Sequence, residues 1–199
     1  MGKNKECVLV STDERLFYLS DDIDNFSIGQ MCFNLLFLLK QDEENENKKK
    51  DFKREPIKIF VNSFGGSTCD MWALVDIMLN SKTPIYTYCT GYAMSAGFKI
   101  FLAGHKRFIS KHATLLYHQL SHFCYGKYQD LKEDMKETDR TQNEIEEYIQ
   151  ERTKITKMRL DEVRERKLDW FIHAKESIEL GIATEMYENE NNTLEKRII

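Results

Sequence analysis

Short apolar segments alternate with helical patterns along the first two thirds of this 199-residue chain. Leu16–Leu19, Ile57–Val61, Ile85–Cys89 and Thr114–Tyr117 have the length and the apolar character of strands, with residues 107–109 as a further short strand. Alternation of this kind places helices against a parallel or mixed sheet, so the sequence predicts an α/β fold. The length fits one domain, and we find no internal repeat.

Four helices are predicted between and after these strands, in addition to the charged helix described next. The first is capped by Asp24 or Asn25 and ends near Lys40, and the second is capped by Ser67 or Thr68. A third leaves the turn at residues 91–97 and runs through Leu102, and a short helix over 174–180 stops at Gly181. The buried faces expected for the first two helices are Phe26, Met31, Leu35, Leu36 and Leu39, and Met71, Trp72, Leu74, Val75 and Met78.

Two segments are strongly charged. Residues 41–54 hold no large apolar side chain except Phe52, which predicts an exposed loop or a frayed extension of the preceding helix. Residues 128–157 carry only a thin apolar stripe, at Leu131, Met135, Ile145 and Ile149. This pattern predicts a helix that projects from the body or packs on a neighbouring molecule.

Composition excludes several functional classes. The net charge is −4, and the lysines at 48–50 follow a run of acidic residues, so no nucleic-acid partner is indicated. The longest apolar stretch, near 31–39, is too short to cross a membrane, and no signal peptide is apparent, which favours a cytoplasmic location. Five scattered cysteines indicate free thiols without paired metal-ligand spacing, although a single one could also serve as a nucleophile.

Two glycine-rich turns are the candidate site. Adjacent glycines at 65 and 66 let the backbone approach a ligand, so Gly66 is a candidate oxyanion donor; they could equally do no more than turn the chain. Ser95 stands among small residues where a strand meets a helix, and its hydroxyl is expected to be exposed there with the N–H of Ala96 free beside it. Small residues in a turn also permit close helix packing, and this turn is not the Gly-x-Ser-x-Gly elbow.

A serine nucleophile needs a base, and the base needs an acid that holds its tautomer. Among five histidines, His118 ends the apolar strand Thr114–Tyr117 and should emerge at a sheet edge. Among 33 acidic residues, Asp169 precedes Trp170, Phe171 and Ile172, which favours a partly buried carboxylate. These residues alone leave the choice of the acid open.

Residues 91–120, GYAMSAGFKIFLAGHKRFISKHATLLYHQL, closely resemble the active-site region of the ClpP family, the proteolytic subunits of Clp proteases. Residues 15–19 are similar to its first core strand, 61–66 to its glycine loop and 169–182 to its last catalytic segment. The resemblance covers roughly nine-tenths of the chain, which makes it far more specific than a single motif.

The resemblance implies a ClpP/crotonase-like fold of repeated β-β-α units with a projecting handle helix. It implies one peptidase domain over 1–199, with a head at about 1–120 and 158–199, a handle at about 121–157 and an inserted loop at about 41–54. It implies a serine endopeptidase in which Ser95 is the nucleophile, His118 the base and Asp169 the third member of the triad. The N–H groups of Gly66 and Ala96 would line the oxyanion hole.

The resemblance also implies partners. Heptameric rings would stack into a tetradecamer, and an AAA+ unfoldase of ClpX or ClpA/ClpC type would feed unfolded polypeptides into the chamber. ATP would be used by that unfoldase, since this chain has no Gly-x-x-x-x-Gly-Lys-Ser/Thr motif; no cofactor and no metal are expected in this chain. Leu120 and Phe64 stand where the family usually has proline, and the segment before Arg15 is shorter than usual.

Two other classes compete with an active peptidase. A non-catalytic ring subunit of the same family is one, and a crotonase-type acyl-CoA enzyme with a related oxyanion hole is the other. The presence of all three candidate triad residues disfavours the first, and the absence of any additional CoA-binding segment disfavours the second.

Overall fold

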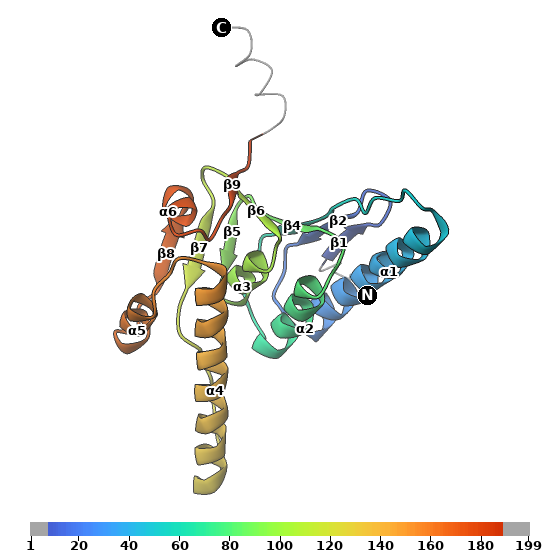
Figure 1. Ribbon diagram of the computed structural model, residues 1–199. Coiled ribbons are helices and arrows are strands. Elements are labelled where there is room, and N and C mark those ends of the chain that lie inside the picture. Colours follow the sequence, from blue (N-terminus) through green and yellow to red (C-terminus); the bar gives the residue numbers. More distant parts are fainter. Residues whose placement is uncertain (1–7, 189–199) are drawn as a thin grey trace, which may run out of the picture.

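A computed structural model describes residues 8–188, which form nine strands and six helices (Figure 1). The strands are β1 (Val8–Ser11), β2 (Leu16–Leu19), β3 (Ile57–Val61), β4 (Ile85–Cys89), β5 (Tyr92–Met94), β6 (Lys106–Ile109), β7 (Thr114–Tyr117), β8 (Trp170–His173) and β9 (Glu185–Met186). The helices are α1 (Asn25–Lys48), α2 (Thr68–Leu79), α3 (Ala96–Leu102), α4 (Tyr128–Arg152), α5 (Lys157–Glu165) and α6 (Ala174–Glu179).

The strands form two sheets. The larger has the order β1-β2-β3-β4-β6-β9, and the smaller has the order β5-β7-β8. Neighbouring strands are parallel except at two pairs, β1 with β2 and β7 with β8. The predicted parallel or mixed sheet is therefore confirmed, but its division into two sheets was not predicted.

The chain repeats one pattern of crossing between these sheets. β4 belongs to the larger sheet and β5 to the smaller, and α3 follows; β6 and β7 then repeat the arrangement before α4. The first repeat is abbreviated, because after β3 the smaller sheet receives only a single bridge from Ser63 to Ala93 before α2 begins. This is the expected β-β-α fold. It places the residues that follow β5 and β7 at the same end of the smaller sheet.

The core lies between the larger sheet and the helices that cover it (Figure 1). Along β3, Ile57, Ile59 and Val61 are fully buried while Lys58 is exposed, as period-two alternation requires. Phe60 points to the opposite face. There it belongs to an aromatic row that crosses four strands, made of Tyr18, Phe60, Tyr88 and Phe108.

Helix α1 is longer than predicted. It is capped by Asp24 as expected, but it continues eight residues beyond Lys40. Its buried face also differs, because Phe26 and Leu36 are exposed; the buried residues are Ser27, Ile28, Met31, Leu35, Leu38 and Asp42. The first half of the charged segment 41–54 is therefore helical. Its residues include good helix formers, and tertiary contacts hold this end of α1 in place.

The contact that holds this extension is a buried carboxylate. Asp42 is 2% exposed and accepts two hydrogen bonds from the Arg15 guanidinium, at 3.1 and 2.7 Å. The Thr83 hydroxyl donates a third at 2.7 Å, and Arg54 donates to Thr83 in turn. The pattern of apolar residues could not reveal this contact, since its partners are polar and lie 27 and 41 residues away.

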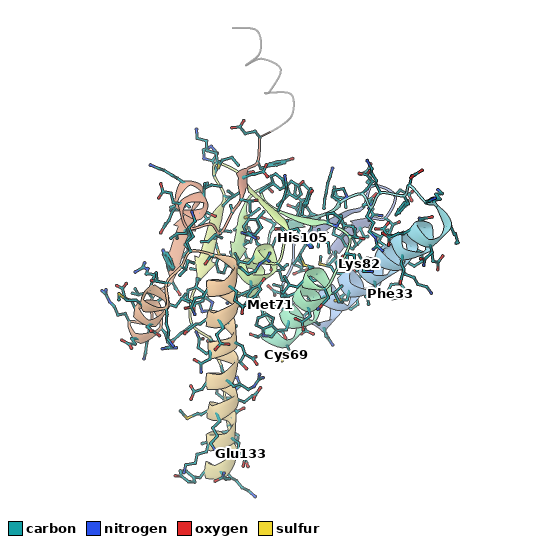
Figure 2. All side chains as sticks on the ribbon, in the orientation of Figure 1. Phe33, Cys69, Met71, Lys82, His105 and Glu133 are labelled. Carbon is teal, nitrogen blue, oxygen red and sulfur yellow. The ribbon has the colours of Figure 1, made fainter. Side chains whose placement is uncertain are left out.

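Helix α4 projects away from the body of the molecule (Figure 1). Ile145 and Ile149 of the predicted stripe are buried at its base, whereas Met135 is 64% exposed. Around Glu133 the charged side chains radiate outward with no other helix beside them (Figure 2). The helix ends at Arg152, earlier than the predicted 157, and the separate helix α5 was not predicted.

Other expectations were refined in smaller ways. Trp72 is half-buried where full burial was expected, and the 91–97 turn contains the short strand β5. α6 ends next to Gly181, which has φ +69°, as predicted. Within residues 8–188 we find no helix with the length and hydropathy of a membrane span.

Removal of the Asp42 carboxylate should destabilise the fold. Asp42→Asn should lower the free energy of unfolding by about 3 kcal/mol, because it leaves the Arg15 guanidinium without its counter-charge in a largely buried position. Urea denaturation at fixed protein concentration would measure the change. The matched control is Glu44→Gln, which breaks the exposed pair with Lys48 and should cost within about 0.5 kcal/mol. Equal effects of the two variants would contradict a special role for Asp42.

Candidate active site

Strand register in the smaller sheet brings the three candidate triad residues to one edge. Met94, the last residue of β5, pairs with Leu116 of β7, and Tyr117 pairs with Trp170 of β8. Ser95 and His118 therefore leave the carboxyl ends of two parallel strands. Asp169 enters the antiparallel strand at the same edge. Because β7 is the central strand, the histidine lies between the serine and the aspartate.

Ser95 adopts a backbone conformation that side-chain-bearing residues seldom occupy. Its φ is +52° and its ψ is −117°, a placement that costs of order 1–3 kcal/mol. The surrounding backbone maintains it: the Ser95 N–H donates to the Leu116 carbonyl, and the Met94 N–H donates to the Ser63 carbonyl, both at 3.0 Å. The side chain is half-buried, less open than the sequence predicted. Strain of this kind at a polar residue is a mark of functional sites.

The glycine loop lies directly against Ser95. A Cβ on Gly65 would come within 2.7 Å of the Ser95 Cβ and 3.1 Å of the Ala96 nitrogen, so only glycine allows this approach. Gly66 has φ +147°, and a Cβ there would lie 2.2 Å from the Ile23 carbonyl oxygen. The two glycines therefore do more than turn the chain, because each permits a backbone contact that a side chain would block.

The N–H groups of Gly66 and Ala96 are both available. Gly66 bridges Ile23 in a parallel pairing in which Gly65 accepts from Ile23 and Ser67 donates to Ile23, so the Gly66 N–H takes no part. Ala96 is the first residue of α3, where helix N–H groups lack partners within the helix. Among residues 8–188, neither N–H donates a hydrogen bond. Two donors of this kind beside a serine can stabilise a developing oxyanion.

Ser63 fixes this arrangement, and sequence reasoning missed it. Its buried hydroxyl donates to the Asp21 carbonyl at 2.7 Å and accepts from the Gly65 N–H at 3.1 Å. Its carbonyl accepts from Met94. A serine two residues before paired glycines is the signal that was present, because such a serine readily bonds to the backbone of the turn that follows it.

His118 has the tautomer that a general base requires. Its Nδ1 lies 2.5 Å from the carbonyl oxygen of Gln119. A carbonyl can only accept, so Nδ1 carries the proton and donates it, which leaves the Nε2 lone pair free to take a proton from a serine. The residue is thus prepared chemically, although its present partner is a backbone carbonyl.

Asp169 differs from the expectation of a partly buried carboxylate. It is exposed. Trp170, the first residue of β8, is buried, and Asp169 lies just before it at the solvent-facing end of the strand. It shares a hollow of about 350 Å³ with His118, lined also by Gln119, Leu120, Ser121, His122, Lys167 and Leu168. Across the part of the chain described here, no hydrogen bond joins Asp169 to His118. The acid and the base are neighbours without being locked together.

A buried polar network anchors the strand that carries His118. Gln142 of α4 accepts from the Leu120 N–H at 2.8 Å and donates to the Tyr117 hydroxyl at 3.2 Å. It also donates to Glu146 at 2.7 Å, and Glu146 receives two hydrogen bonds of 2.9 Å from Arg164. Gln142 therefore holds the chain on both sides of His118.

Lys99 is a buried cation on α3, four residues after Ser95. Its side chain is 3% exposed, and Nζ lies 5.5 Å from the centre of the Tyr117 ring. Burial lowers the pKa of Lys99 to about 8. Burial likewise raises the pKa of Tyr117 to about 12, so the phenol stays protonated as a partner for Gln142. The burial of this lysine was not predicted, because a lysine is normally exposed even when it stands in an otherwise apolar helix.

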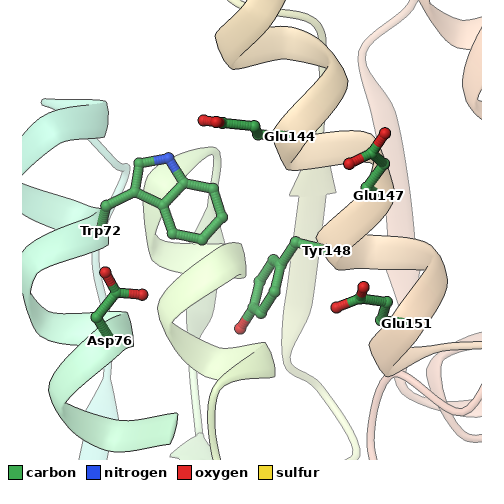
Figure 3. Close-up of a pocket in the computed structure, with 6 residues that line it drawn as sticks. All are labelled: Trp72, Asp76, Glu144, Glu147, Tyr148 and Glu151. Carbon is green, nitrogen blue, oxygen red and sulfur yellow. The ribbon is translucent and has the colours of Figure 1, made fainter. Parts of the chain in front are cut away.

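A second hollow lies between α2 and α4, away from Ser95 (Figure 3). Trp72 and Tyr148 meet edge to face there, with ring centres 5.3 Å apart. Carboxylates surround them, from Asp76, Glu144, Glu147 and Glu151. The residues lining this hollow include no serine, cysteine or histidine, so it does not compete with the Ser95 edge as the site of nucleophilic chemistry.

The fold and the site together describe an α/β protein in which a strained serine, a histidine and an aspartate lie at one end of the smaller sheet, with two free N–H groups near the serine. Comparison with known proteins gives the class. The model of the Clp protease family matches residues 3–190. The chain is also 30% identical over 171 residues to ATP-dependent Clp protease proteolytic subunit 1 of Shouchella clausii (strain KSM-K16), covering 85% of this chain and 82% of that protein.

The chain therefore belongs to the Clp protease family. At the level of class it is a peptidase, a proteolytic subunit of Clp type, and the resemblance drawn from the sequence is confirmed. Family membership also argues against an acyl-CoA enzyme. The roles of Ser95, His118, Asp169, Gly66 and Ala96 remain predictions, supported by the geometry described above.

Lys99 should make stability depend on pH. Its folded-state pKa lies below the usual 10.5, so between about pH 8 and pH 10.5 the unfolded chain binds more protons, and stability rises with pH. Lys99→Met should raise the free energy of unfolding by about 3 kcal/mol at pH 7 and by little at pH 10. Chemical denaturation of both proteins at these pH values tests this. The wild type and the variant both contain Tyr117, Tyr148 and Cys89, whose pKa values are raised by burial. These groups make stability fall as pH rises, and their effect cancels when the two proteins are compared at the same pH. A difference independent of pH would contradict the prediction.

Proposed function

We propose that this chain is a serine endopeptidase in which Ser95 attacks the peptide carbonyl. His118 acts as general base and then as general acid, and Asp169 orients the imidazolium. The observation that supports the proposal is the register of the smaller sheet, since the three residues lie at the same end of its strands and the N–H groups of Gly66 and Ala96 near Ser95 are unpaired.

The reaction follows from the donors and acceptors present. His118 Nε2 takes the hydroxyl proton as Ser95 Oγ bonds to the substrate carbon, and the carbonyl oxygen gains negative charge. The N–H groups of Gly66 and Ala96 stabilise that charge, an effect worth about 3 kcal/mol per donor in acyl transfer. Collapse expels the amine, which receives the proton from His118. Water then attacks the acyl carbon while it gives a proton to His118, and His118 returns that proton to Ser95 Oγ as the carboxylic acid product leaves.

Activation requires a local rearrangement of His118. Its Nδ1–H donates to the Gln119 carbonyl, yet orientation by Asp169 requires the same N–H to face the carboxylate. The exposed Asp169 becomes an effective partner when residues 119–120 shift and water is excluded from the shared hollow. Since Gln142 of α4 holds Leu120, contacts made by α4 control that shift.

Assembly would supply those contacts. The proposed handle, at about 121–157, includes the projecting α4, and through it two heptameric rings of this chain would stack into a tetradecamer. The charged and largely exposed surface of α4 supports this role. A helix with so thin an apolar stripe buries little surface against its own chain, so contacts with another molecule would stabilise it most. The head would comprise about 1–120 and 158–199, with 41–54 as an insertion.

The proposed substrates are unfolded polypeptides, delivered by an AAA+ unfoldase of ClpX or ClpA/ClpC type that hydrolyses ATP. The substrate would add as an extended strand near Phe64, which is 64% exposed and stacks on Tyr92 with ring centres 4.2 Å apart. We propose a cytoplasmic enzyme without a bound cofactor.

A non-catalytic ring subunit is the second candidate function. The specific observation that favours it is the exposed Asp169, which makes no hydrogen bond to His118 in the single chain. The two candidates differ in whether assembly brings these groups together, and this can be measured.

A fluorophosphonate probe tests the nucleophile. The wild-type protein should label at Ser95 and Ser95→Ala should not, while Ser20→Ala, which changes an exposed serine before the site, should label normally. Native mass measured on the same samples should approach fourteen chains for all three. A ring of that mass that does not label would identify the non-catalytic subunit, and labelling that survives in Ser95→Ala would contradict the assignment of the nucleophile.

The same preparations test the acid. Asp169→Asn should lower kcat for a fluorescent unfolded protein by about 10³–10⁴-fold while leaving the native mass unchanged, because the asparagine no longer stabilises the imidazolium. Asp161→Asn, which removes a carboxylate paired with Arg164 in the nearby α5, is the matched control and should leave kcat within about twofold. A similar loss in both variants would show that Asp169 acts only through folding.

A further inference from the structure

The segment after β7 lies alongside α4 and places three different ligand types together. From His118 to Lys127 the chain descends beside the helix before turning into it (Figure 1). His122 and Cys124 lie on this segment and Asp134 lies on α4. His122 Nε2 is 3.0 Å from the Asp134 carboxylate, and donor atoms of all three side chains lie within 4.8 Å of one another.

We propose that His122, Cys124 and Asp134 bind a divalent zinc ion. An imidazole, a thiolate and a carboxylate are the ligand types that zinc takes in proteins, and the soft sulfur disfavours magnesium and calcium. Ligand bonds of about 2.0–2.3 Å in tetrahedral geometry place donor atoms roughly 3.3–3.8 Å apart. The present separations therefore need only small side-chain rotations, and water would occupy the fourth position.

The surroundings allow an ion to enter. In the single chain, His122 and Asp134 are 47% and 43% exposed, so solvent reaches both side chains. A hollow of about 280 Å³ lies beside His122 and Cys124, and Met135 also lines it. The linear sequence could not indicate this set, because Asp134 lies ten residues beyond Cys124 and comes into position only when the segment doubles back along α4.

The site is separate from the proposed catalytic edge but adjacent to it. His122 lines the same hollow as His118 and Asp169, four residues after the proposed base. Bound zinc would tie the 119–127 segment to α4 in addition to the hydrogen bond from Leu120 to Gln142. The ion has no place in the Ser95 chemistry, so the proposal stands or falls independently of the proposed function.

Cobalt substitution tests the site directly. The full-length protein, purified without a histidine tag and stripped with a chelator, should take up one Co²⁺ per chain and develop a thiolate-to-metal absorption band together with the visible bands of tetrahedral cobalt. Added Zn²⁺ should remove both. Cys124→Ser should abolish the thiolate band, and His122→Gln and Asp134→Asn should each weaken binding by more than about tenfold.

Matched variants separate a built site from incidental binding. Cys69→Ser changes an exposed thiol on α2, and His112→Gln changes an exposed histidine outside the segment; both should bind cobalt as the wild type does. Circular dichroism confirms that each variant is folded. The proposal is overturned if the wild type gives no thiolate band at millimolar Co²⁺, if the band persists in Cys124→Ser, or if folded Asp134→Asn binds as tightly as the wild type.

Discussion

Ser63 makes the contacts that hold the proposed catalytic edge together. Its hydroxyl joins the glycine loop to the segment before α1, and its carbonyl accepts from the residue before Ser95. Three parts of the chain that are distant in sequence therefore meet at one buried residue. The strained backbone of Ser95 and the close approach of Gly65 both depend on this junction, because neither would persist without surrounding contacts that fix them.

Much of this architecture could be predicted from the sequence, and the failures have physical causes. Apolar alternation identified the inner strands, since Ile57, Ile59 and Val61 face one core. Sequence resemblance selected Asp169, which composition alone could not single out from 33 acidic residues. What escaped were interactions between distant polar groups: Asp42 with Arg15, and Gln142 with Leu120. A hydrophobic pattern carries no information about such partners, so α1 was predicted too short and the anchoring of His118 was missed.

The candidate site combines groups that are ready with one that is not. The glycine loop and the Ser95 turn already present two unpaired N–H groups, and His118 already has its proton on Nδ1. Among the described residues, no hydrogen bond joins Ser95 to His118, and the link from Nδ1 to Asp169 is absent as well. His118 belongs to a short segment that Gln142 of α4 holds through Leu120. The position of α4 therefore affects the proposed catalytic groups through residues 118–120.

Helix α4 is fixed at one end only, as a cantilever is. Its 25 residues extend about 37 Å, and its buried contacts are concentrated in the half nearest the body, at Gln142, Ile145, Glu146, Tyr148 and Ile149. Force applied to the free half meets exposed polar contacts, such as that of His122 with Asp134, before it reaches the first residue of the helix that is buried. That residue is Gln142. A mechanical load on the far end of the helix is therefore delivered next to the imidazole, which makes α4 a lever as well as a surface.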